Sequence, residues 1–142
     1  MNLATFERAQ VAAFAYCRAR HTGSIECMRA ICYVLRNRLR AGWGNGSWIH
    51  LIEHSADIDG NVVQRSQEID PQDRLLQLLV RDIDDIYLGQ SSDDTRTVIE
   101  DNKALYYVFI RDPISDWFRD KIIRDPVNHA RIAGIGPIDF YK

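Results

Sequence analysis

Apolar side chains recur every three or four residues over much of the chain, which is the spacing of one face of an α-helix. The first such stretch predicts a helix over residues 5–20, with Thr5 as its N-cap. The second predicts a helix from the cap Ser24 to a stop at Gly42. Its apolar positions form one stripe that we expect to be buried: Ile25, Met28, Cys32, Leu35 and Leu39.

A glycine-rich loop, residues 42–46, separates these two helices from a short helix that Ser47 is expected to cap. Residues 55–69 have no hydrophobic period and are predicted to form a long loop. Within it, Asp57–Asn61 is similar to part of a calcium-binding loop. An EF-hand, however, places its glycine after a third ligand and ends on a glutamate at a fixed distance. We interpret the segment as a solvated acidic turn and predict no metal site and no cofactor.

The next helix is predicted from its two ends. Asp70 and Pro71 suit the N-cap and the first helical position, and Gly89 suits the C-terminal stop. Residues 90–96 are polar and are predicted to be a linker.

The C-terminal third carries strand patterns as well as a helix. Residues 104–109 read as a short strand, and Asp112-Pro113 is expected to open a helix. Residues 132–141 are punctuated by glycine and proline and are expected to pair with that strand. These elements predict an α+β fold, mainly α, with one small β-hairpin near the C-terminus.

Length and composition indicate one globular domain over residues 1–142, because 46% of the residues are apolar and 27% are charged. The net charge of -2 provides no overall positive field, so we expect no long nucleic acid partner. No apolar run approaches the roughly 18 residues of a membrane span, and the N-terminus lacks the pattern of a secretory signal. Three cysteines in apolar helical patterns, Cys17, Cys27 and Cys32, suit a reducing compartment. We therefore expect a cytoplasmic protein without a membrane partner.

Two segments are similar to a known family. Residues 24–38 read SIECMRAICYVLRNR, and the Asn-Arg pair at the end of this helix is the distinctive part. Near the C-terminus, Ala104-Leu105-Tyr106-Tyr107, then Trp117, then residues 135–141 (IGPIDFY) follow in order. Both segments resemble the SleB-type cell wall hydrolases, over residues 13–54 and 101–142. The resemblance implies a lysozyme-like helical fold.

The residue on which catalysis depends in that family is replaced. There the helix is preceded by E-A-R-G-E, whose first glutamate is the general acid, and an ungapped alignment puts Ala19 at that position. Cleavage of a glycosidic bond needs a protonated carboxylic acid beside the bond, which alanine cannot supply. Glu26 matches a later family glutamate and is the candidate for a relocated acid, although it lies about two helical turns, roughly 10 Å, from Ala19. The alternative is that Glu26 is only a negative charge at the start of the helix, where the helix dipole stabilises it.

A groove without the acid can still bind a ligand. Arg20 and His21 precede the helix that begins after Ser24, where main-chain N–H groups favour an anion such as a phosphate or nucleotide. The aromatic candidates for stacking on a sugar or base are Tyr106, Tyr107 and Trp117, each with core packing as the alternative. Trp43, in the glycine-rich loop, is a further candidate, although it could instead seal a helix end.

Other polar residues are expected to be structural. His50, His54 and His129 have no triad spacing and are interpreted as surface histidines. Asn37 and Arg38 are expected to brace the fold at a helix end.

Three functional hypotheses follow. The first is a non-catalytic relative of the SleB-type hydrolases, of phage or mobile-element origin, that binds or sequesters a small anionic, nucleotide-like or glycan ligand. The second is an active peptidoglycan glycosidase whose acid is Glu26, Glu100 or Asp101. The third is a protein-interaction scaffold, and a homo-oligomer is left open.

Overall fold

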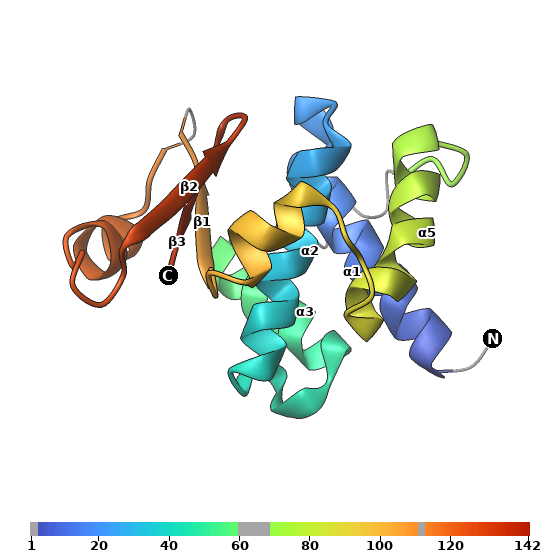
Figure 1. Cartoon of the computed structure of the whole chain (residues 1–142), viewed down its shortest axis with the longest axis horizontal. Helices are drawn as coiled ribbons and strands as arrows, with labels where there is room; N and C mark the ends of the chain where they lie inside the picture. Colours follow the sequence, from blue (N-terminus) through green and yellow to red (C-terminus); the bar gives the residue numbers. More distant parts are fainter. Residues whose placement is uncertain (1–2, 60–68, 111–112) are drawn as a thin grey trace.

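A computed structural model describes residues 3–59, 69–110 and 113–142. A group of packed helices lies beside a small antiparallel sheet, and the orange α6–η4 segment lies on the far side of that sheet (Figure 1). The predicted α+β class, mainly helical, is confirmed. The helical elements are α1 (Leu3–Ala19), the 3₁₀ turn η1 (Arg20–Thr22), α2 (Ile25–Arg40), the 3₁₀ turn η2 (Trp43–Gly46), α3 (Trp48–Asp59), α5 (Arg74–Leu88), the π-helical turn η3 (Arg96–Glu100), α6 (Asp116–Phe118) and the π-helical turn η4 (Arg119–Ile123).

Helix α2 lies at the centre of the helical group, against α1, α5 and η3. Its start is as predicted, because the Ser24 hydroxyl accepts a hydrogen bond from the Cys27 N–H at 3.3 Å. Burial extends beyond the predicted stripe, since every residue from 30 to 38 is buried. A helix buried on all sides has partners on all sides. Met28, Cys32 and Leu35 are buried as expected, whereas Ile25 and Leu39 are only partly buried.

Two predicted helix starts are wrong by a few residues. Helix α1 begins at Leu3, so Thr5 lies inside it rather than capping it. Helix α5 begins at Arg74, and its N-cap is Asp73, which accepts from the N–H groups of Leu75 and Leu76. Asp70 instead accepts from the Gln72 N–H, within a separate turn. The two aspartates lie three residues apart, and the cap is the one adjoining the apolar face of α5.

Two other boundaries also differ from the predictions. Residues 55–59 form the end of α3, so this part of the predicted loop is helical, and residues 60–68 lie outside the described residues. Asp57–Asp59 are therefore helical, while Gly60 and Asn61 lie outside the described residues. The linker after Gly89 is shorter than expected, because helical structure resumes at Asp94. Gly89 itself ends α5 as predicted, in the left-handed conformation with φ 73°.

The sheet has three strands in the order β1-β3-β2, all antiparallel: β1 (Tyr106–Phe109), β2 (Arg131–Ile135) and β3 (Ile138–Tyr141). The predicted pairing of the last stretch with the first strand is confirmed, with Tyr106 opposite Tyr141. The C-terminal residues also form a hairpin of their own, in which β2 pairs with β3 across a turn at Gly136, where φ is 53°. This hairpin adds the third strand. The preceding helix α6 begins at Asp116 and is capped by Ser115; of the predicted start, Pro113 is not helical and Asp112 lies outside the described residues.

The two faces of the sheet pack against different elements. Tyr107, Phe109 and Phe140 face the main core together with the helices. Tyr141 and the partly buried Tyr106 face Phe118 and its neighbours on the far side. Successive strand residues point to opposite faces, so neighbouring tyrosines have different environments.

Three further properties bear on the sequence analysis. All three cysteines are buried and free of disulfides. Among the described helices, none combines the length and the hydropathy that crossing a bilayer requires. In the described parts of the chain, no three histidine, cysteine or acidic side chains gather into a group that could hold a metal ion.

Candidate functional site

The residue that the resemblance aligns with the general acid of the SleB-type hydrolases is an alanine in the core. Ala19 is the last residue of α1, and it is 0% exposed. Glu26 is exposed in the first turn of α2, where a negative charge is stabilised by the helix dipole. No carboxylate therefore replaces the acid at its own position in the sequence.

Arg20 and His21 form the connection between α1 and α2. The pKa of Asp73 is lowered mainly by the hydrogen bond from Tyr16, and the partly buried Arg20 adds a smaller electrostatic contribution. The His21 ring packs against Phe109, with ring centres 4.9 Å apart. Thr22 accepts a hydrogen bond from the Ser24 N–H at 3.2 Å, so the connection is held by its own side chains. The anion site expected here stays a prediction.

Tyr107 is part of the core. It is 3% exposed, and its hydroxyl accepts a hydrogen bond from Arg18 Nε at 3.2 Å. The guanidinium groups of Arg18 and Arg38 each lie 5.6 Å from its ring centre. Tyr107 therefore packs in the core, which was the alternative to stacking on a ligand.

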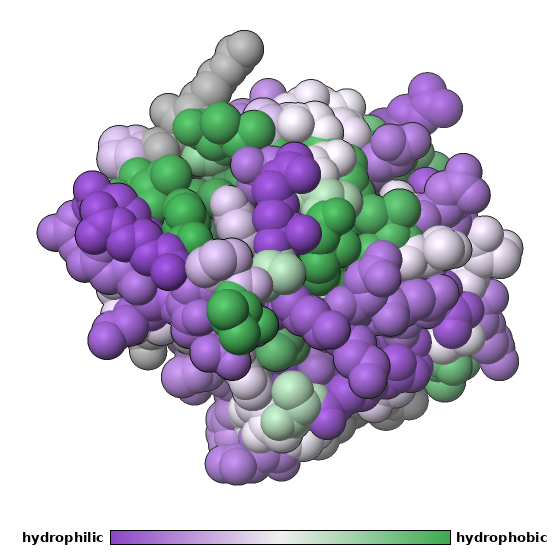
Figure 2. Space-filling model, turned by 60° about the vertical axis from the view of Figure 1, so that its left-hand side comes forward, coloured by the Kyte–Doolittle hydropathy of each residue, from purple (hydrophilic) through white to green (hydrophobic). Residues whose placement is uncertain are grey.

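Three of the predicted aromatic residues come together from distant parts of the sequence. Tyr106 lies 5.7 Å from Trp43 and 6.3 Å from Trp117, measured between ring centres. Trp117 is 47% exposed, and the other two are partly exposed. We call Trp43, Tyr106 and Trp117 the aromatic surface. The face of the molecule on the side of the sheet shows hydrophobic residues in several patches between hydrophilic ones (Figure 2).

Two histidines border the aromatic surface, which the sequence did not indicate. The His54 ring lies 5.6 Å from Trp43, and the His129 ring lies 5.3 Å from Tyr106, both edge to face. His54 follows Trp43 and His129 follows Tyr106 in the chain, each at a spacing that predicts no contact. Only the folded chain brings them into contact.

The position of Trp43 depends on Arg38 and on Gly44. The Arg38 guanidinium lies over the Trp43 ring, 4.9 Å from its centre, and Arg38 Nε donates to the Leu105 carbonyl at 2.7 Å. At Gly44 the backbone has φ 72°, and an added Cβ would lie 2.7 Å from the Leu51 nitrogen. Only glycine fits there, because it has no Cβ and adopts positive φ without strain.

Asn37 connects α2 to the segment before β1. Its side-chain amide donates to the carbonyls of Ile99 at 3.2 Å and Ala104 at 3.0 Å. Arg38, next in the chain, binds the carbonyl of Leu105. These contacts join α2 to the segment before β1, as expected if the Asn-Arg pair braces the fold at a helix end.

Glu100 is the centre of a buried ionic cluster. Its carboxylate pairs with Arg36, with Arg96 at 2.7 Å and with Arg40 at 3.2 Å, and its side chain is only 2% exposed. A general acid must reach the scissile bond, whereas both oxygens of this carboxylate accept hydrogen bonds from arginine side chains. The sequence shows parts of this cluster, because Arg36 and Arg40 lie four residues apart, as do Arg96 and Glu100, and residues at this spacing are neighbours on a helix.

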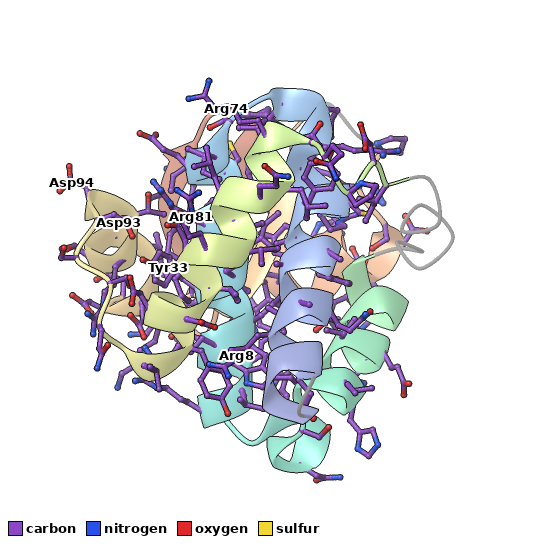
Figure 3. All side chains as sticks on the ribbon, turned by 90° about the vertical axis from the view of Figure 1, so that its right-hand side faces the viewer. Arg8, Tyr33, Arg74, Arg81, Asp93 and Asp94 are labelled. Atoms are coloured by element: carbon purple, nitrogen blue, oxygen red, sulfur yellow. The ribbon has the colours of Figure 1, made fainter. Side chains whose placement is uncertain are left out.

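A polar network continues from this cluster toward α5. Arg96 also donates to the Ser91 carbonyl, and the Tyr33 hydroxyl bonds to the side chains of Ser91 and Asp93. Burial, and the Asp93 carboxylate to which the hydroxyl donates, raise the pKa of Tyr33. Figure 3 shows Asp93 near Tyr33 and its neighbour Asp94 pointing away. The network fixes the segment between α5 and η3.

Glu100 also lines a pocket of about 540 Å³ at the C-terminal end of α2. Asp101, which was also considered as a relocated acid, lines the same pocket and is exposed. Arg40 and Lys103 are its cationic residues. None of the three aromatic-surface residues lines it, although Leu105 does and is the neighbour of Tyr106 in the chain.

Comparison with family models, with curated proteins and with solved structures finds no match to this chain. The resemblance to the SleB-type hydrolases therefore stays a prediction, carried by the two segments of sequence described above.

Proposed function

We propose that this protein is a non-catalytic relative of the SleB-type cell wall hydrolases, which acts in the cytoplasm and binds a glycan or nucleotide-like ligand on the aromatic surface. The observation that carries the proposal is the meeting of Trp43, Tyr106 and Trp117, which come from three separate elements. A small factor of phage or mobile-element origin that binds or sequesters such a ligand fits this description.

Partly exposed aromatic rings suit ligands with flat or apolar faces. A sugar ring or a nucleobase stacks on such a ring, and each stacked base contributes about 1–3 kcal/mol. Trp117 provides the most exposed ring of the three. His54 and His129, at the border, add polar ring nitrogens that can bond to hydroxyl groups.

The placement of the carboxylates supports binding over glycosidic cleavage. Ala19 is buried in the position of the acid, Glu26 is exposed at a helix start, and Glu100 is surrounded by arginines. Cleavage requires a protonated carboxylic acid at the scissile bond, commonly paired with a second carboxylate. The active-glycosidase alternative would need Glu26, Glu100 or Asp101 to supply the proton.

Calorimetric titration with soluble peptidoglycan fragments and, separately, with nucleoside monophosphates tests the proposal. We expect saturable binding of one of these ligands that Trp117→Ala weakens by at least about tenfold, the equivalent of 1.4 kcal/mol. Leu88→Ala is the matched control, because Leu88 is an exposed apolar residue on α5. Failure of both ligand classes to bind would overturn the proposal. Digestion of peptidoglycan that Glu26→Gln abolishes would establish the glycosidase alternative instead.

A further inference from the structure

The pocket at the end of α2 has the properties of a binding site of its own. Its volume of about 540 Å³ falls within the range of small-molecule sites, about 300–1,000 Å³. It lies between the last turn of α2 and the segment that joins η3 to β1, and Asn37, Arg40, Asp101 and Lys103 are among its lining residues. The side chain of Glu100 forms its buried charged part.

Positive charge is in excess around the pocket. Arg36 and Arg96 form ion pairs with Glu100, while Arg40 and Lys103 line the pocket itself. The pocket and its ion pairs therefore contain four cations and two carboxylates, those of Glu100 and Asp101. The carbonyl end of α2 adds a partial negative charge of about half a unit, which leaves the excess positive. The chain as a whole has a net charge of -2, so this excess is a local feature.

The buried carboxylate is already paired with cations of the protein itself. Oε1 of Glu100 accepts from Arg36 and lies 3.2 Å from a guanidinium nitrogen of Arg40, and Oε2 accepts from Arg96. Arg40, by contrast, is 57% exposed, and only one of its guanidinium nitrogens contacts Glu100 in that ion pair. A guanidinium has five N–H donors, so Arg40 can bond to Glu100 and to a ligand oxygen at once.

Lys103 is the second cation at the pocket. Within residues 3–59, 69–110 and 113–142, its ammonium makes no ion pair or hydrogen bond with another side chain. Its backbone has φ 60°, a left-handed conformation that is uncommon for a residue with a side chain. Such conformations cluster at binding sites, where the surrounding structure maintains them. The π-helical turn η3, another feature enriched at functional sites, ends at Glu100 just before this segment.

We infer that this pocket binds a small oxyanion, a phosphate or carboxylate compound, through the side chains of Arg40 and Lys103. The inference is independent of the proposed function, because the pocket and the aromatic surface share no residue. Phosphate and carboxylate compounds have charged oxygens in common, and both accept charge-assisted hydrogen bonds from guanidinium and ammonium groups.

Calorimetric titration of the full chain with inorganic pyrophosphate and, separately, with citrate tests the inference at constant ionic strength. We expect saturable binding that Lys103→Gln and Arg40→Gln each weaken by about tenfold, in keeping with the loss of a charge-assisted contact. Lys121→Gln removes an exposed lysine from η4 and should leave the affinity unchanged. Asp101→Asn removes a repelling carboxylate at the pocket and should tighten binding.

Each outcome decides the inference or its details. Binding of pyrophosphate alone assigns the pocket to phosphate compounds, binding of citrate alone assigns it to carboxylates, and binding of both assigns it to oxyanions in general. No saturable binding of either probe at millimolar concentration overturns the inference. Equal affinities for Lys103→Gln and the unmodified protein, or an equal loss in Lys121→Gln, also overturn it. Lys103 is exposed, so its variant reports on binding in a folded protein, which circular dichroism checks.

Discussion

The guanidinium of Arg38 lies over the ring of Trp43, 4.9 Å from the ring centre. Arg38 is 0% exposed, and its Nε donates to the carbonyl of Leu105, immediately before Tyr106. One buried arginine therefore contacts Trp43 in the turn after α2 and the main chain just before Tyr106, the two segments whose aromatic rings meet. The aromatic surface depends on this contact.

Replacement of Arg38 by lysine should destabilise the fold. Arg38→Lys retains the charge but loses the planar group that stacks on Trp43 and binds Leu105. We expect the free energy of unfolding to fall by about 2 kcal/mol, measured by urea denaturation. Arg40→Lys is the control, since Arg40 is mostly exposed, and its cost should stay under about 0.5 kcal/mol. Equal costs for the two variants would contradict the stacking interpretation.

Removal of the Asn37 side chain should destabilise the fold. Asn37→Ala removes a buried donor from the carbonyls of Ile99, which keeps the Ala104 N–H, and Ala104, and we expect a cost of about 2–3 kcal/mol in the free energy of unfolding. Asn102 also donates to a main-chain carbonyl, that of Val98, but is exposed. Asn102→Ala should cost less than about 1 kcal/mol, because water can replace the lost bond. Thermal melts that fail to separate these variants would argue against the brace.

The charge of Glu100 should be needed for stability. Glu100→Gln leaves Arg36 buried without its carboxylate, and breaking a buried ion pair costs about 3–5 kcal/mol. The exposed neighbour Asp101 provides the matched control, and Asp101→Asn should change the free energy of unfolding by less than about 0.5 kcal/mol. Chemical denaturation compares the two. A Glu100→Gln protein as stable as the original would mean that the cluster contributes nothing to folding.

Two glycines in η2 should differ in their tolerance of alanine. Gly44→Ala combines a left-handed backbone with a Cβ 2.7 Å from the Leu51 nitrogen, so we expect a cost of at least about 2 kcal/mol. Gly46 also has positive φ, 80°, but an added Cβ would meet nothing within 4 Å. Gly46→Ala should therefore cost only the backbone strain, about 1 kcal/mol. Similar melting temperatures for the two variants would show that the turn relaxes around the added methyl group.

The acid dependence of stability should include a contribution from Asp73. The Tyr16 hydroxyl, followed by the N–H groups of Leu76 and Leu75, bonds to this carboxylate and holds its pKa below the usual value. A lowered folded-state pKa gives stability that is complete above the unfolded-state pKa, near about 4, and that is lost as the pH falls through the folded-state pKa.

Asp73→Asn tests this contribution while keeping a residue that can cap α5. Between about pH 5 and about pH 2, the unmodified protein should lose more of its free energy of unfolding than the variant does. Urea denaturation at a series of pH values measures the difference. Parallel pH profiles would show that Asp73 titrates alike in the folded and unfolded chains.

Most helices and their ends followed from the sequence because their determinants are local. Ser24 caps α2 and Gly89 ends α5 as predicted, since a cap bonds to main-chain groups only two or three residues away. The misplaced start of α5 has a physical reason too. Asp70 and Asp73 are both good caps, and packing of the apolar face that starts at Leu75 selected the second.

The candidate sites were predicted less well, because they depend on contacts between distant residues. Alternation along a strand requires Tyr106 and Tyr107 to face opposite sides, but packing against α2 decided which one is buried. The sequence likewise shows Arg96 four residues before Glu100, without indicating that Arg36 lies against the same carboxylate from 64 residues away.

The sequence by itself determined the main helices, several of their ends and the pairing of the last strand with the first, because residue spacing and capping act over a few neighbours. Only the tertiary structure decided that Trp43, Tyr106 and Trp117 share a surface, and that Arg40, Glu100 and Lys103 border one pocket. Those positions result from the packing of α2 against η3 and of the sheet against the helices, which joins parts of the chain that have no local signal for one another.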